Sequence, residues 1–229
     1  LYPGLVYVVF PGNVGDSQAL VRVAGTLKAT NKSARKSKGG GVRMPDVPMS
    51  IQELKEMAVT IRCDIIEMIA TAQAGHPGGS LSAADIVTAL YFRIMNIDPK
   101  NPDWPERDRF ILSKGHACPV WYAALAERGY FNKAHLGSLR RIDSILQGHP
   151  DMRKTPGIDM TAGSLGQGMS AGLGMALSGK LLGKSYHVWV VIGDGEMQEG
   201  AVWESAMAAP KWNLDNLTYI LDRNHFQND

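Results

Sequence analysis

The sequence predicts an α/β protein in which helices cover a mostly parallel sheet. Segments with helical spacing of apolar residues alternate with short apolar runs. Two of these runs, "HVWVVI" (187–192) and "NLTYILD" (216–222), are apolar on both faces, which is typical of strands buried between two layers. The chain has 229 residues and no internal repeat, so it suits one large domain or two small ones.

The first predicted helix begins at Ser50. "SIQE" is a capping box in which Ser50 is the N-cap and Glu53 is the third helical residue. Apolar residues then recur at helical spacing up to Gly75: Ile51, Leu54, Ala58, Ile61, Ile65 and Ile69.

Four further helices follow. The second is expected from about Ser82, its N-cap, with Ile86, Leu90 and Ile94 on one face. "PVWYAALAERG" (119–129) predicts the third, which ends at a glycine. In "GQGMSAGLGMALSGKLLG" (166–183), glycines and alanines favour a helix packed closely on a sheet. A helix over about 199–210 would join the two predicted strands.

Residues 1–46 form a separate segment without a sustained period. "LVYVVFPG" suits one short strand, and "KATNKSARKSKGGGVR" is basic and rich in glycine and serine. We expect a flexible segment here, with an anion-binding arm as the alternative. Met44 and Met49 precede the first helix, which suggests that residues 1–43 are an over-extended reading frame. The folded domain is expected over 47–229.

Composition excludes several classes of protein. Apolar residues make up 45% and charged residues 20% of the chain, and no apolar run reaches the roughly 20 residues that span a bilayer. A net charge of +2 does not favour a nucleic-acid partner. The two cysteines, Cys63 and Cys118, form no CxxC motif or disulfide framework, which favours the reducing cytoplasm.

Polar side chains follow both strong strands. Asp194 lies between two glycines after "VWVVI", and Asn224 follows "YILDR". If these strands are parallel neighbours, the two side chains meet where open parallel sheets bind ligands. Carboxylate and amide oxygens suit Mg²⁺ or Ca²⁺, and the metal would hold a diphosphate. An alternative remains open, in which Asp194 is only a turn or cap residue.

Three histidines each follow a glycine: His76 in "AGHPGGS", His116 in "SKGHAC" and His149 in "LQGHPD". A single histidine is usually a packed or surface residue. Three in polar, glycine-flanked loops favour the lining of a polar ligand site.

Residues 50–229 resemble the N-terminal, diphosphate-binding half of transketolase, and most closely the separate N-terminal subunit of split transketolases. Five collinear motifs carry the resemblance: "GHPGGSLSAADIVTALYF", "RDRFILSKGHA", "QGHPDMRKTPGIDMTAGSLGQGMSAGLGMAL", "GDGEMQEGAVWESAMAA" and "LTYILDRN". The resemblance implies the three-layer thiamine diphosphate-binding fold, with a mostly parallel sheet between helices.

The resemblance also implies a cofactor site. Asp194, the side chain of Asn224 and the main-chain carbonyl of Phe226 would bind the metal, Mg²⁺ or Ca²⁺. Asn224 and Gly195 would contact the diphosphate of thiamine diphosphate, and His116 would face the cofactor.

The family stretch that cradles the aminopyrimidine of the cofactor corresponds to Gly163, Ser164 and Leu165. His76 and His149 match histidines that contact the substrate's oxygens and assist proton transfer. Glu199 matches a glutamate at the subunit interface. Its alternative role is that of an acid stabilised at a helix N-terminus.

The implied activity is transfer of a two-carbon ketol unit from a ketose, typically a sugar phosphate, to an aldose. It would require a C-terminal partner subunit with the pyrimidine-binding domain, in a heterotetramer. "NHFQND" departs from the family's usual loop, and Ser164 replaces a common proline, as in split members. The sequence also ends before the rest of the family's domain, so we expect the chain alone to be inactive.

The sequence leaves three other functions open. Two are other thiamine enzymes, a deoxyxylulose-phosphate synthase and the α subunit of a 2-oxo acid dehydrogenase. "GHPDMRKTPGID" argues against both. The third is a non-catalytic subunit that binds cofactor for assembly, which the retention of three histidines disfavours.

Overall fold

The computed structural model describes residues 6–11, 48–225 and 227. They form a four-stranded sheet with the spatial order β1-β4-β3-β2, in which every neighbouring pair is parallel. The strands are β1 (Val6–Pro11), β2 (Arg109–Leu112), β3 (Val188–Gly193) and β4 (Leu217–Arg223). The predicted α/β class and parallel sheet are confirmed.

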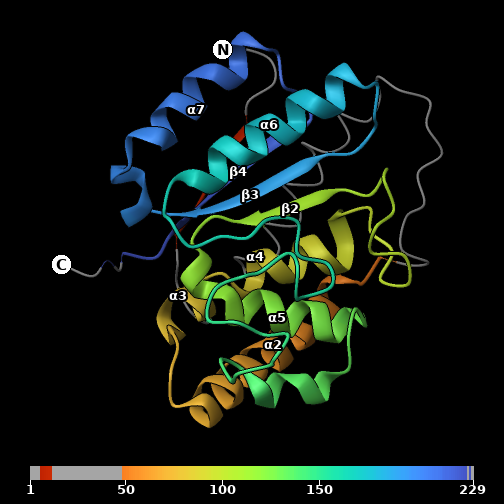
Figure 1. The fold of residues 1–229 in the computed structure, drawn as a ribbon, viewed down its shortest axis with the longest axis vertical. Coiled ribbons are helices and arrows are strands. Elements are labelled where there is room, and N and C mark those ends of the chain that lie inside the picture. Colours follow the sequence, from red (N-terminus) through yellow and green to blue (C-terminus); the bar gives the residue numbers. More distant parts are fainter. Residues whose placement is uncertain (1–5, 12–47, 226, 228–229) are drawn as a thin grey trace.

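Helices cover both faces of this sheet (Figure 1). α6 (Gln167–Leu181) and α7 (Gly200–Lys211) lie on one face. On the other side of the sheet lie α4 (Ala84–Ala89) and α5 (Cys118–Arg128), and α2 (Ile51–Ala72) packs against these two helices. Shorter helical segments complete the domain: α3 (Pro77–Ser82), η1 (Leu90–Ile94), η2 (Gly115–Ala117), η3 (Lys133–Ser138) and η4 (Gly195–Gln198).

The sheet separates two hydrophobic cores. β3 is buried along its whole length, and its side chains alternate between the two sides. Trp189 and Val191 belong to the core with α2, α4 and α5. Val188, Val190 and Ile192 belong to the core with α6 and α7. Because β3 is buried on both faces, its sequence is a continuous apolar run.

The predicted first helix is α2, and its capping box is present. Glu53 N–H donates to Ser50 Oγ at 3.3 Å, and Ser50 N–H donates to Glu53 Oε2 at 2.6 Å. The helix ends at Ala72, where Gln73 adopts a left-handed conformation with φ of 50°.

The predicted start of the second helix was wrong. Ser82 is the last residue of α3 rather than an N-cap, and α4 continues from Ala84 without a side-chain cap. The Ser82 hydroxyl instead donates to Asp222 Oδ2 at 2.6 Å. α3 starts at Pro77, five residues before the predicted start at Ser82. Proline is tolerated at the first helical position because the N–H that it lacks would have no partner within the helix.

Two sequence expectations concern the N-terminal segment. The short strand allowed by "LVYVVFPG" is β1, whose Val8 pairs in register with Ile220 of β4. The basic run that suggested a flexible segment or an anion-binding arm lies outside the described residues, as do Met44 and the rest of 12–47. Within the described ranges, none of the helices has the length and apolar character needed to cross a bilayer.

α6 packs directly on β3 because it carries glycine at the contact. A Cβ on Gly172 would lie 2.5 Å from Val190 Cγ2, whereas a Cβ on Gly174 would meet nothing within 4 Å. We therefore expect Gly172→Ala to lower the free energy of unfolding by about 1–3 kcal/mol through overpacking. Gly174→Ala should raise it by about 0.5–1 kcal/mol, since alanine favours the helix. Urea unfolding of both variants tests the pair, and equal effects would contradict this packing.

Candidate functional site

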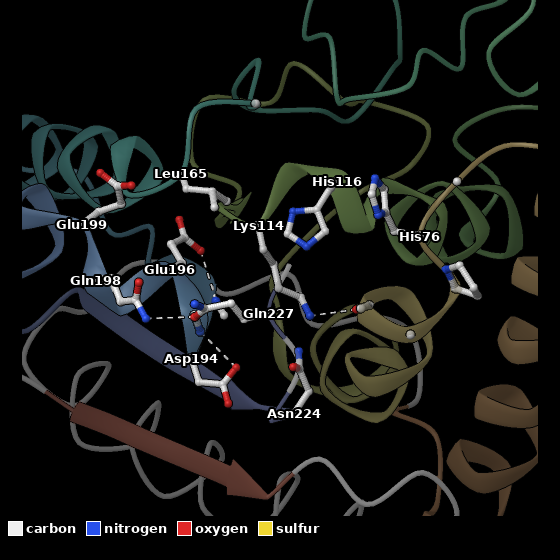
Figure 2. A pocket seen from close by; sticks show the side chains of 17 residues that line it. His76, Lys114, His116, Leu165, Asp194, Glu196, Gln198, Glu199, Asn224 and Gln227 are labelled. Atoms are coloured by element: carbon white, nitrogen blue, oxygen red, sulfur yellow. Dashed lines mark hydrogen bonds between the residues drawn. The ribbon is translucent and has the colours of Figure 1, made fainter. Parts of the chain in front are cut away.

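The carboxyl ends of three strands meet at one cavity of about 600 Å³. β2 leads into Lys114 and His116, β3 into Asp194, and β4 into Asn224. This is the edge of a parallel sheet where ligands generally bind. The cavity is lined by Gly75, His76, Pro77, Gly78, Gly79, Lys114, His116, Gly163, Leu165, Gly193, Asp194, Gly195, Glu196, Gln198, Glu199, Asn224 and Gln227 (Figure 2).

Asp194 and Asn224 line the same cavity, as the sequence predicts. Asp194 is the N-cap of η4, and its Oδ1 accepts from Gly195 N–H at 3.1 Å. Its Oδ2 accepts from His225 N–H at 2.8 Å, which ties the loop after β3 to the loop after β4. Each carboxylate oxygen has a second lone pair, so both retain capacity for a cation.

The third predicted metal ligand, the carbonyl of Phe226, lies outside the described residues. Among the residues that are described, no three histidine, cysteine, aspartate or glutamate side chains cluster to hold a metal. A metal here would therefore depend on Asp194, the carboxamide of Asn224 and other oxygens. Such a mixed oxygen set suits Mg²⁺ or Ca²⁺ rather than Zn²⁺.

His76 and His116 line the side of the cavity away from Asp194 (Figure 2). The rings of His76 and His116 pack edge to face with centroids 5.2 Å apart. His149 does not line the cavity, but its ring lies beside Gly163, where a Cβ would be 3.8 Å from His149 Cδ2. The structure thus brings all three predicted histidines to one region.

Burial keeps the His116 imidazole neutral. It lowers the pKa of His116 to about 4, with further contributions from Lys114, His76 and His149. Burial likewise lowers the pKa of His149, and the nearby Arg140 adds to that shift. At neutral pH each neutral ring can therefore accept a hydrogen bond at one nitrogen and donate one at the other.

The lowered pKa of His116 predicts a pH dependence of stability. Between pH 6.5 and about 4, the unfolded chain binds a proton at this histidine while the folded protein does not. The free energy of unfolding should therefore fall as the pH is lowered through this window. Urea unfolding at pH 7 and pH 5 should show a larger loss for the wild type than for His116→Gln. An equal loss in both proteins would contradict a neutral His116.

The predicted cofactor cradle is only partly within the cavity. Gly163 and Leu165 line it, whereas Ser164 is exposed and is not among the lining residues. Gly166 follows with φ of 82° and is the N-cap of α6. A side chain there would collide with Glu199, whose Cβ would lie 2.8 Å away.

Glu199 itself is exposed at the rim of the cavity. It is the N-cap of α7, but its side chain makes no capping hydrogen bond. Glu199 therefore lies where its alternative role, that of an acid stabilised at a helix N-terminus, requires it. The interface role stays a prediction.

Sequence reasoning missed Lys114, which is buried with 1% of its side chain exposed. Its ammonium donates to Gly79 O at 2.7 Å and to Ser82 Oγ at 3.3 Å, and it forms an ion pair with the equally buried Asp222. Asp222 Oδ1 is buried without a hydrogen-bond partner in the described structure. Lys114 thus links helix α3 to the end of β4.

Glu196 was also missed. It is 3% exposed and accepts hydrogen bonds from Ser113, Gly166 and Gly193. The only sequence signal for either residue is a charged side chain inside a glycine-rich motif, "SKGHAC" and "GDGEMQEG". Two glutamines also line the cavity, and Gln198 Nε2 donates to Gln227 Oε1 at 2.9 Å.

Comparisons with known proteins agree with this geometry. Residues 53–229 match the family described as transketolase, thiamine diphosphate binding domain. Over 177 residues the chain is 50% identical to a 6-deoxy-6-sulfo-D-fructose transketolase subunit of Clostridium sp. (strain MSTE9), covering 77% of this chain and 64% of that protein. It is 43% identical to an apulose-4-phosphate transketolase subunit of Actinobacillus succinogenes, covering 78% and 65%.

A solved structure, transketolase from Leishmania mexicana, superposes with a TM-score of 0.71 at 31% identity, covering 73% of this chain and 27% of that one. The chain thus spans less than two thirds of each of these relatives. The match to the family nevertheless extends over most of the sequence, including every loop that lines the cavity from Gly75 onward. The chain therefore belongs to the transketolase family, within its thiamine diphosphate binding domain.

Proposed function

We propose that this chain is the N-terminal component of a transketolase-type enzyme and that residues 47–229 are its diphosphate-binding domain. The observation that carries the proposal is the convergence of Asp194, Asn224, His76 and His116 on one cavity at the carboxyl edge of the sheet. Membership of the family supports thiamine diphosphate as the ligand.

The residues around the cavity fit a diphosphate held through a metal. Glycines let a ligand approach the backbone closely, and Gly193 and Gly195 flank Asp194 in the lining of the cavity. Asp194, Asn224 and the Phe226 carbonyl are the proposed ligands of Mg²⁺, with Ca²⁺ as the alternative. Gly195, Asn224 and His116 would contact the diphosphate side of the cofactor.

The loop of Gly163, Ser164 and Leu165 would contact the aminopyrimidine. When bound, thiamine diphosphate supplies the carbon nucleophile and electron sink that break the bond beside a ketose carbonyl. His76 and His149 would hold the substrate's oxygens and transfer protons at them, which their neutral or exposed rings allow.

The complete reaction needs more than this chain. Two similar proteins are named as transketolase subunits, and this chain spans about two thirds of each. We therefore place the pyrimidine-binding domain on a C-terminal partner subunit, in a heterotetramer with Glu199 at the interface. Sugars or sugar phosphates are the proposed substrates. The free thiols of Cys63 and Cys118 support the cytoplasm as the compartment.

Reconstitution with a C-terminal transketolase subunit tests the activity. The assay supplies a ketose phosphate donor and an aldose phosphate acceptor and measures transfer of the two-carbon unit. We expect turnover only when both subunits, thiamine diphosphate and Mg²⁺ are present. A complex that assembles and binds the cofactor but transfers nothing would favour a non-catalytic subunit instead.

A further inference from the structure

Glu196 lines the cavity and is almost fully buried. Its side chain is 3% exposed, although it belongs to the short η4 segment beside Asp194. Oε1 accepts from Gly166 N–H at 2.7 Å and from the Ser113 hydroxyl. Oε2 accepts from Gly193 N–H at 3.1 Å.

The three donors belong to three different segments of the site. Ser113 follows β2 and precedes Lys114 and His116. Gly166 ends the loop that begins with Gly163 and starts α6. Gly193 is the last residue of β3 and directly precedes Asp194. One carboxylate therefore connects the loops that carry the predicted cofactor contacts.

We propose that Glu196 is the positioning residue of the cofactor site, because its carboxylate sets the relative positions of the Ser113–His116, Gly163–Gly166 and Gly193–Gly195 loops. The expected effect of Glu196 on cofactor affinity rests on the proposed function. The positioning itself concerns only residues of this chain and can be measured without a ligand.

The donors around Glu196 suit a carboxylate acceptor, because all three hydrogen bonds run toward its two oxygens. Gly166 N–H lies at the N-terminus of α6, where the helix dipole favours a negative charge. Only the ionised carboxylate can accept from all three donors without offering a proton of its own.

Glu196→Gln is the direct test because glutamine keeps the size and replaces one acceptor oxygen with an NH₂ donor. Asp159→Asn is the matched control. Asp159 is also a buried carboxylate, 8% exposed, and accepts from Phe110 N–H at 2.9 Å and from Arg107, near the start of β2 and away from the cavity. Ser113→Ala is a milder variant that removes only one of the three donors.

Two measurements are made on each protein: amide hydrogen exchange without ligand, and the Kd for thiamine diphosphate with Mg²⁺ and the partner subunit present. Glu196→Gln should speed exchange at least tenfold in segments 113–117, 163–168 and 193–198 together. It should also raise the Kd at least tenfold, as loss of supporting contacts does in metal sites. Ser113→Ala should shift both in the same direction by a smaller factor.

Asp159→Asn should leave exchange in these three segments and the Kd within about threefold of wild type. The proposal is overturned if Glu196→Gln and Ser113→Ala leave exchange there unchanged, or if Asp159→Asn alters it equally. It is also overturned if the loops loosen in Glu196→Gln while the Kd stays at the wild-type value. If wild type binds no thiamine diphosphate, the proposed function fails, and the exchange data still decide whether Glu196 positions the loops.

Discussion

Replacing Lys114 with methionine is expected to lower the free energy of unfolding by about 3–5 kcal/mol, because it leaves the buried Asp222 carboxylate without its cation. Both side chains are 1% exposed, so water cannot replace the lost partner. The Lys114 hydrogen bonds to Gly79 O and Ser82 Oγ are lost as well. Chemical unfolding of the variant without cofactor measures the effect.

Two further variants separate the effect of the stranded charge from the effect of burying the ion pair. Adding Asp222→Asn to Lys114→Met removes the stranded charge, so it should recover a large part of the loss. Lys184→Met breaks the pair with Glu106, whose side chains are 37% and 35% exposed, and should cost at most about 1 kcal/mol. A Lys114→Met loss no larger than that of Lys184→Met would contradict the importance of the buried pair.

Replacing Asp194 with alanine is expected to abolish metal-dependent binding of thiamine diphosphate. At about 100 times its Kd, the cofactor with Mg²⁺ should stabilise the wild type by roughly 2.7 kcal/mol. For a domain of this size, that corresponds to a rise in Tm of about 5–10 °C. Thermal unfolding with and without the ligands, alone and with the partner subunit, should show this rise for wild type and none for Asp194→Ala.

The control for this prediction is Asp215→Ala, which removes an exposed carboxylate that pairs with Lys180 at 3.5 Å, remote from the cavity lining. This variant should keep the full metal-dependent rise in Tm. A rise in Asp194→Ala equal to that of wild type would show that the carboxylate does not hold the diphosphate. No rise in wild type with the partner present would contradict the cofactor itself.

Much of the fold could be predicted because its elements carry strong local signals. The capping box of Ser50 and Glu53 determined the start of α2, and the two-sided apolar run of β3 identified a buried parallel strand. β2 was not predicted because it has only four residues, of which the first, Arg109, is charged. The start of α3 at Pro77 was missed because glycines in "GHPGGS" suggested a loop.

The residues of the site also fall into two groups, those that the sequence predicts and those that it does not. Asp194, Asn224 and the histidines stand out because glycines or strand ends flank them, and the parallel sheet brings those ends together. Lys114 and Glu196 were missed because their importance depends on burial and on partners remote in sequence, Asp222 and Ser113. Such long-range contacts have no periodic signature in a single sequence.

Anomalous diffraction tests the central claim most directly. Crystals of the chain with its partner subunit would be grown with thiamine diphosphate and Mn²⁺ as the probe for the metal. We predict a manganese peak bonded to the Asp194 carboxylate and the Asn224 carboxamide, with the diphosphate beside Gly195 in the cavity at the carboxyl ends of β3 and β4. Manganese or cofactor bound elsewhere, with this cavity holding neither, would contradict the account.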